Sequence, residues 1–157
     1  MPLKNQTFSL DVLKQLKTKY PQIKMMFVGK RYDENYCQIF DNKIKELSLE
    51  NNIIISENFD NKEGVLDTAS IVMIPSLKEG LSLVAVEAQS TGIMVFASKG
   101  VPEDVDLGNI VHLDLNSALW AEKIDNYFSK NKNYRHSVDT SKFSLIKFKE
   151  GIKKIYN

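Results

Sequence analysis

Short apolar runs alternate with amphipathic stretches along most of the chain, and this alternation is the strongest constraint on its fold. Apolar residues that recur about every 3.6 positions predict helices near residues 8–20, 36–47, 63–69, 82–91 and 119–128. Apolar runs predict strands at residues 23–28, 53–55, 71–74, 93–96 and 109–113. This order favours right-handed crossovers and a parallel sheet. We therefore expect an α/β fold, a doubly wound parallel sheet, with ligands beyond the carboxyl ends of its strands.

The first predicted element is a helix, whereas a doubly wound domain usually begins with a strand. The length of 157 residues fits one domain. We therefore expect a single domain over residues 1–157 that lacks its usual first strand. Two explanations are open: the domain is unusual, or a piece is missing upstream.

Composition narrows the classes of protein. The content of 43% hydrophobic and 26% charged residues is that of a globular domain, and the net charge of +1 argues against a general nucleic-acid binder. A single cysteine, Cys37, excludes an internal disulfide and fits a reducing compartment. The sequence has no apolar run of about 18 residues and no signal-peptide core. We expect a cytoplasmic protein.

The charges are unevenly distributed. Residues 129–157 contain eight Lys or Arg and two acids, whereas the rest of the chain contains 13 basic and 18 acidic residues. Two interpretations are open for the basic segment. It is either a solvated basic helix or a tail that lies near an anionic membrane surface.

The most informative segment, residues 75–89, follows a predicted strand and opens a predicted helix. Gly80 permits a sharp turn and the close approach of a ligand, and Ser82 is a candidate N-cap. Gly92 lies where a helix C-cap is expected. Free backbone amides and the positive end of the helix dipole make such a turn a binding site for an anion, such as a phosphate.

Two carboxylates, Glu79 and Glu87, frame this turn. Glu87 lies among apolar neighbours, where a charge is costly unless it is partnered, and the vicinal hydroxyls of a ribose are a natural partner. Glu79 would lie nearer the far end of a diphosphate. The alternative, an ordinary strand–turn–helix with solvated or capping glutamates, is left open by these residues alone.

The segment resembles the Glu-seven residues-Glu signature of the group 1 retaining glycosyltransferases, with its Pro-Ser, Glu-Gly-Leu and Glu-Ala-Gln flanks. The resemblance extends over nearly the whole chain. Residues 2–6 resemble the phosphate-lysine turn of the family, residues 27–29 its second strand and loop, and residues 69–76 the strand before the signature. Residues 103–107 and 120–124 resemble the capsular and exopolysaccharide branch.

The resemblance implies a specific organisation. Family members have two Rossmann-like domains, of which the C-terminal one binds the nucleotide-sugar donor and the N-terminal one most of the acceptor. This chain resembles the C-terminal domain only, so the acceptor domain is expected to be absent and the chain inactive alone. The expected donor is a UDP- or GDP-sugar, without a cofactor or a metal.

The resemblance also assigns roles position by position. Glu79 would contact the transferred sugar and act as the catalytic residue, and Glu87 would hold the ribose. The remaining donor-binding positions implied are Lys4 for the diphosphate, the amides of Gly80, Leu81, Ser82 and Leu83 for the phosphates, Asn58 and Phe59 near the base, and Gly29 for backbone approach. Lys30 and its neighbour Arg31 would lie there too, in either a phosphate-binding or a solvated role.

Other polar residues are expected to be structural. The Asp104-Val105-Asp106 segment imitates a metal-binding Asp-x-Asp, but it fits the family in register. His112 and His136 lack ligand spacing, and Cys37 and Trp120 are expected to pack in their helices.

Two other functions are alternatives: a nucleotide-sugar epimerase-like domain, and a non-enzymatic subunit that docks on a separate acceptor-binding protein. Apolar residues among the lysines of residues 143–156 predict weak self-association. The implied partners are the nucleotide-sugar, the missing acceptor domain and a lipid-linked acceptor at the inner face of the membrane, but no nucleic acid.

Overall fold

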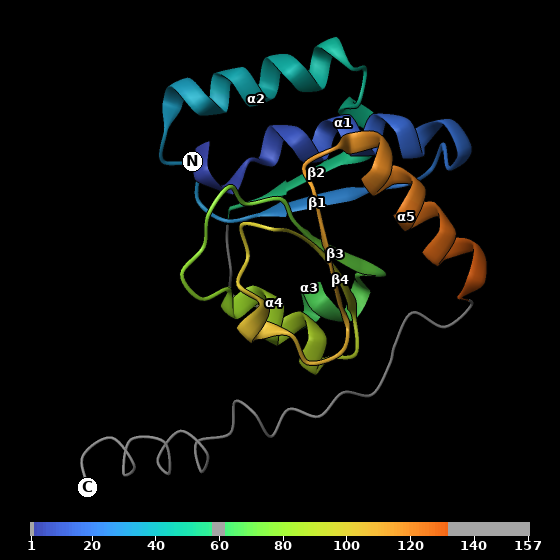
Figure 1. The fold of residues 1–157 in the computed structure, drawn as a ribbon. Helices are drawn as coiled ribbons and strands as arrows, with labels where there is room; N and C mark the ends of the chain where they lie inside the picture. The colour runs from blue at the N-terminus through green and yellow to red at the C-terminus, as the bar shows by residue number, and fades with distance from the viewer. Residues whose placement is uncertain (1, 58–61, 132–157) are drawn as a thin grey trace, which may run out of the picture.

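The computed structural model describes residues 2–57 and 62–131, in which strands and helices alternate as predicted (Figure 1). The strands are β1 (Met25–Val28), β2 (Ile53–Ser56), β3 (Ile71–Ile74), β4 (Met94–Ser98) and β5 (Ile110–Leu113). The helices are α1 (Gln6–Lys19), α2 (Glu34–Glu46), α3 (Lys62–Thr68), α4 (Leu83–Ser90) and α5 (Ser117–Lys130), with short 3₁₀ turns η1 (Pro2–Lys4), η2 (Glu50–Asn52) and η3 (Glu103–Val105). The predicted α/β fold is confirmed.

The strands form two parallel sheets rather than the single sheet that we expected. Strand β1 pairs with β2, and β4 lies between β3 and β5. The usual doubly wound order places the first strand of the domain between these two groups. Among the described residues, none before α1 forms a strand, and β1 and β3 each leave one edge without a partner strand. The sheet divides at this position.

Helix α1 packs on both sheets at once. Leu10 and Leu13 are fully buried in a cluster with α2, β1 and β2. Val12 and Leu16 pack instead with β4, β5 and α5, in a cluster that includes Trp120. Trp120 is completely buried, and its ring meets that of Phe8 edge-on at 5.2 Å between centroids. The prediction that Trp120 packs in a helix is confirmed.

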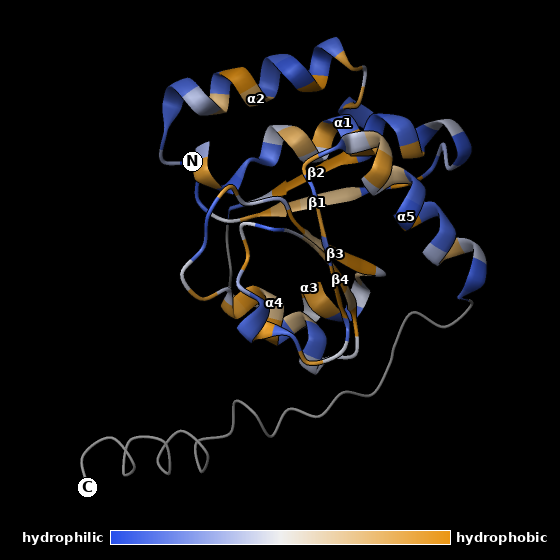
Figure 2. Ribbon diagram, in the orientation of Figure 1, coloured by the Kyte–Doolittle hydropathy of each residue, from blue (hydrophilic) through white to orange (hydrophobic). Residues whose placement is uncertain are grey.

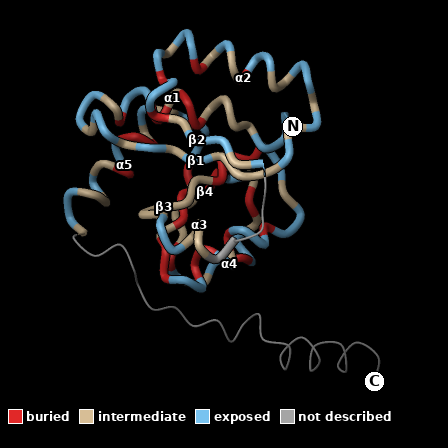
Figure 3. Tube along the Cα trace, turned by 180° about the vertical axis from the view of Figure 1, so that it is seen from behind, coloured by how far each residue is buried: buried red, intermediate tan, exposed pale blue. Residues whose placement is uncertain are grey.

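The opposite faces of the two sheets are covered differently. Helices α3 and α4 pack against the β3–β4–β5 sheet through a cluster that includes Ile74, Ala85 and Val95. On the β1–β2 sheet, the paired residues Met26 and Ile54 are 42% and 41% exposed. Figure 2 shows that apolar residues are concentrated in the strands, and Figure 3 shows buried segments where the helices cover them. Among the described residues, the β1–β2 sheet is thus packed mainly on the face that α1 and α2 cover.

The ends of α4 are defined by local hydrogen bonding. Gly92 has a φ of 81°, and its N–H donates to Gln89 at 2.8 Å while that of Ile93 donates to Ala88 at 3.1 Å. This pair of bonds is a Schellman motif, so the prediction of a glycine that ends this helix is confirmed. At the other end Ser82 occupies the N-cap position, but its side chain makes no capping hydrogen bond.

Several sequence predictions fall outside the described residues. These are the roles of Asn58, Phe59 and His136, and those of most of the basic segment at residues 129–157. Within residues 2–57 and 62–131, no helix is both long and apolar enough to span a bilayer.

One side-chain cluster joins α1 to α5 through the titratable carboxylate of Asp125. Lys19 Nζ donates to both carboxylate oxygens of Asp125 at 2.6 and 2.9 Å, and the Tyr20 hydroxyl donates to Oδ1 at 2.6 Å. The hydrogen bond from Lys19, followed by that from Tyr20, lowers the pKa of Asp125. Its charged form is therefore favoured by folding, and this contribution is lost as the pH falls through the lowered pKa.

We expect Asp125→Asn to lower the midpoint of thermal unfolding at pH 7, and the difference from wild type to shrink below about pH 4, where the native carboxylate is increasingly protonated. Circular dichroism melts between pH 3 and pH 7 measure this. Asp114→Asn is the matched control, because Asp114 pairs with Lys99 at 2.8 Å with both side chains largely exposed. A loss for Asp125→Asn that stays constant across this range would contradict the prediction.

Candidate functional site

The loop between β3 and α4, residues 75–82, is fixed from two sides. The N–H of Leu77 donates to the carbonyl of Leu3 in η1 at 2.8 Å, and the N–H of Glu79 donates to the carbonyl of Gly100 at 2.9 Å. The Ser98 hydroxyl donates to the carbonyl of Ser76. Two other segments, η1 and the residues at the end of β4, therefore set the path of this loop.

Gly100 allows the turn after β4 to pack against this loop. A Cβ at this position would overlap the backbone carbonyls of both Ser76 and Leu77, with the Ser76 oxygen only 2.6 Å away. Because backbone atoms cannot rotate aside as a flexible side chain can, only glycine fits here without displacing the loop. Gly80 is the opposite case: it has a negative φ, and a Cβ there would meet no atom within 4 Å. The packing of the described residues therefore does not require a glycine at position 80.

The carboxylate of Glu79 is held by two donors on one oxygen. Lys4 Nζ donates to Oε1 at 2.7 Å, and the Ser76 hydroxyl donates to the same atom at 2.6 Å. The Glu79 side chain is 8% exposed and that of Lys4 is 50% exposed. Sequence reasoning assigned both Glu79 and Lys4 to the donor but did not predict that they bind each other, because they lie 75 positions apart.

The start of α4 offers backbone donors. In the part of the chain that the structure describes, the N–H groups of Gly80, Leu81, Ser82 and Leu83 donate to no protein acceptor. They lie at the positive end of a helix dipole, beside a glycine with open space around it. This geometry suits an anion with several oxygens.

Glu87 is exposed on α4, so the expectation of a costly charge among apolar neighbours is wrong. Helical spacing places it on the same face as Leu83 and Val84, which are both more than half exposed. The assignment to a ribose stays a prediction.

The loop after β1 carries the other predicted positions. Gly29 has a φ of 134°, which a residue with a side chain adopts only with strain, and its N–H donates to Ser56 at 2.9 Å. Lys30 is exposed. Arg31, for which a phosphate or solvent role was open, instead binds Asp41 at 2.6 Å, and this hydrogen bond raises the pKa of the guanidinium. None of the hydrogen bonds or ion pairs among the described residues joins Gly29 or Lys30 to the loop at residues 75–82.

Gln89 is a structural residue that the sequence reasoning missed. It is fully buried; its Nε2 donates to the carbonyls of Ala85 and Val105, and its Oε1 accepts from the N–H groups of Leu107 and Asn109. The side chain thus ties α4 to the segment that follows η3. Because α4 also contains the polar residues Glu87 and Ser90, nothing in the sequence alone singled out Gln89 as the buried one.

The Asp104-Val105-Asp106 segment forms η3 and its cap. Val105 is buried in the core, and Asp106 Oδ1 accepts from the N–H of Gly108 at 2.6 Å. Across residues 2–57 and 62–131, no three His, Cys, Asp or Glu side chains gather as metal ligands would. Cys37 is half-buried in α2, and His112 lies on β5 with its Nε2 buried.

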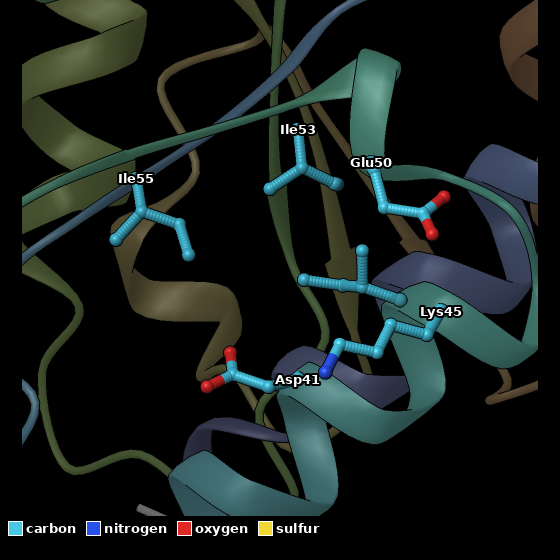
Figure 4. Close-up of a pocket in the computed structure, with 6 residues that line it drawn as sticks. Asp41, Lys45, Glu50, Ile53 and Ile55 are labelled. Atoms are coloured by element: carbon cyan, nitrogen blue, oxygen red, sulfur yellow. The ribbon is translucent and has the colours of Figure 1, made fainter.

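A hollow of about 390 Å³ lies elsewhere, between α2 and β2 (Figure 4). Its lining mixes charged and apolar side chains: Asp41, Ile44, Lys45, Glu50, Ile53 and Ile55. It shares no residue with the predicted donor site.

These features define a Rossmann-like α/β domain with free backbone amides at the start of α4, and comparison with known proteins identifies its family. The family model for glycosyl transferases group 1 matches residues 1–142. The chain belongs to this family of glycosyltransferases.

Individual relatives are moderately similar. The putative glycosyltransferase EpsF of Bacillus subtilis (strain 168) is 28% identical over 126 residues, which are 78% of this chain but 32% of EpsF. The structure of Anabaena Alr3699/HepE in complex with UDP and glucose is 26% identical, with a TM-score of 0.74 over 83% of this chain and 36% of that one. The chain therefore spans about a third of the length of these relatives.

A further structure supports the fold alone. The C-terminal domain of the group 1 family glycosyl transferase LpcC from Francisella tularensis is 24% identical, with a TM-score of 0.69 over 83% of this chain and 71% of that chain.

We expect Gly100→Ala to lower the free energy of unfolding by about 1–3 kcal/mol, because its Cβ overlaps backbone atoms of the loop. Gly80→Ala is the matched control and should change the free energy of unfolding by less than about 1 kcal/mol, since its Cβ meets open space. Urea unfolding followed by fluorescence of Trp120 measures both. An equal decrease in the free energy of unfolding for the two variants would contradict the prediction that overlap with the loop backbone destabilises Gly100→Ala.

Proposed function

We propose that the chain is the donor-binding half of a retaining glycosyltransferase, and that it binds a nucleoside diphosphate sugar with UDP or GDP as the nucleotide. The observation that carries this proposal is the turn at residues 79–83, where free amides at the start of α4 lie beside Gly80 and next to the Lys4–Glu79 pair. The structure of Anabaena HepE with UDP and glucose supports a donor of this class.

The proposed chemistry depends mainly on electrostatic stabilisation of the departing diphosphate. The amides of residues 80–83 would donate hydrogen bonds to its oxygens, the helix dipole would stabilise its negative charge, and the ammonium of Lys4 would add a full positive charge. Glu79 would contact the transferred sugar, and Glu87 would accept hydrogen bonds from the ribose hydroxyls. Asn58 and Phe59 would lie near the base, and Gly29 and Lys30 would border the site.

Lys4 would have to serve two anions. In the structure its ammonium binds Glu79, and three N–H donors let it bind a phosphate oxygen as well. A diphosphate would therefore join an existing ion pair, which keeps the charge of Glu79 compensated. This arrangement accounts for a buried carboxylate so close to the proposed position of an anion.

The acceptor-binding half would be a separate domain that precedes this one in the whole protein. One observation supports this organisation: the chain spans about a third of the length of EpsF and of HepE. The chain alone would bind the donor without transferring the sugar.

The proposed product is a surface polysaccharide or glycoconjugate, made in the cytoplasm at the inner face of the membrane. The similarity to EpsF and the basic residues of segment 129–157 support this setting. A partner-dependent subunit that docks on a separate acceptor-binding protein is the second candidate, and the open strand edges are the observation that favours it.

We expect wild-type chain to bind UDP or GDP saturably in isothermal titration calorimetry, and Glu87→Ala to weaken that binding at least about tenfold, because two hydrogen bonds to a charged acceptor are lost. Glu122→Ala, which removes an exposed carboxylate on α5, should bind as wild type. Wild-type affinity in Glu87→Ala would remove the ribose assignment, and absence of saturable binding by wild type would refute the proposed function.

We expect a strand supplied before Met1 to join the two sheets. Six residues alternating Val and Ile, fused to the N-terminus, should slow amide hydrogen exchange in β1 and β3 at least about tenfold, because their unpaired N–H groups gain acceptors. A fusion of equal length in which alternate residues are Pro is the control, since proline cannot complete the ladder. Equal exchange in the two fusions would contradict a strand position between β1 and β3.

A further inference from the structure

Ser76 has no assigned role, yet it is the most buried partner of the Glu79 carboxylate. The residue is 1% exposed, and its hydroxyl donates to Glu79 Oε1 at 2.6 Å. That distance is typical of a hydroxyl bonded to a charged oxygen, which makes this hydrogen bond one of the stronger kind. In the part of the chain that the structure describes, Glu79 Oε2 accepts no hydrogen bond and is free for another donor.

The position of the Ser76 hydroxyl is itself fixed. Ser76 follows the last residues of β3, and its carbonyl accepts from the hydroxyl of Ser98 on the neighbouring strand β4. The Ser98 hydroxyl in turn accepts from the N–H of Gly100 at 3.1 Å, and Gly100 accepts from the N–H of Glu79. A closed chain of hydrogen bonds therefore holds Ser76 and Glu79 relative to each other.

Lys4, the other partner of Oε1, is held less firmly. Its side chain is half exposed, and an ammonium on a flexible four-carbon stem adopts many positions at little cost. An incoming diphosphate would attract this ammonium. The Ser76 hydroxyl carries no charge and is buried, so a diphosphate has little effect on it.

We propose that Ser76 is a positioning residue for the donor sugar: it holds the Glu79 carboxylate by Oε1 so that Oε2 stays directed to the sugar while Lys4 is shared with the diphosphate. This inference rests on the proposed function for the role of Glu79. It adds that the two partners of Oε1 have different roles: Lys4 also binds the diphosphate, whereas Ser76 keeps Glu79 oriented toward the sugar.

The test compares UDP with UDP-glucose as ligands of the same chain, by isothermal titration calorimetry. Ser76→Ala should bind UDP within about twofold of wild type but UDP-glucose about tenfold more weakly. The substitution removes the hydrogen bond that orients Glu79, and only UDP-glucose carries the sugar that Glu79 is proposed to contact. A role in holding the fold would weaken both ligands alike. Ser90→Ala, which removes an exposed hydroxyl bonded within α4, should change neither affinity.

A double-mutant cycle tests whether Ser76 affects UDP-glucose affinity through Glu79. In a Glu79→Ala background, Ser76→Ala should cause no further loss of UDP-glucose affinity, because Ser76 acts through Glu79. A further tenfold loss in that background, or an unchanged UDP-glucose affinity in the single variant, would overturn the proposal.

A measurement without ligand separates this inference from the proposed function. Crystal structures of wild type and Ser76→Ala should show one Glu79 conformer in the former and several in the latter. If wild type bound neither UDP nor UDP-glucose, the proposed function would fail, and these structures would still test Ser76. A single, unchanged Glu79 conformer in Ser76→Ala would overturn the positioning role.

Discussion

The packing of α1 against two separate sheets is the constraint on which the rest of this structure depends. No backbone ladder joins β1 to β3, so the two sheets are held together through side chains that α1 presents on both of its apolar faces. Leu10 and Leu13 serve one sheet, while Val12 and Leu16 serve the other. Because η1 leads directly into α1, this packing also places Leu3 and Lys4 against the loop that carries Glu79. The position of the candidate site follows from the position of one helix.

The loop at residues 75–82 is closely packed against η1 and the turn after β4, whereas the space around Gly80 is open. Gly100 permits backbone contact so close that no side chain fits, whereas Gly80 faces space that the described residues leave empty. The two glycines thus have opposite reasons for being present. A rigid, preorganised turn with free amides loses little freedom when it binds an anion, and this is the condition under which electrostatic stabilisation is most effective.

Local patterns predicted the elements of this fold well, because periodicity and terminal glycines such as Gly92 act within a few residues. The division of the sheet was less predictable. The sequence indicated that the usual first strand is lacking, but not that the remaining strands would separate into two sheets. The site was predictable as a set of residue types around Gly80. Its internal contacts were not, because the Lys4–Glu79 pair and the Gln89 network depend on where distant segments lie. The expectation that Glu87 lies in apolar surroundings was wrong for a related reason: Leu83 and Val84, its apolar neighbours on the same helix face, are themselves more than half exposed.

Glu79 and Glu87 therefore differ in physical character. Glu79 is nearly buried and its charge is compensated in the protein, so it can be held in one orientation before any ligand arrives. Glu87 is exposed and can exchange water for hydroxyl groups at little cost. A buried, oriented carboxylate suits the position where geometry must be exact to within a fraction of an ångström, next to the reacting sugar. An exposed carboxylate suits recognition of a ribose that only has to be held. The difference in burial between the two side chains is what the proposed order of roles along the donor requires.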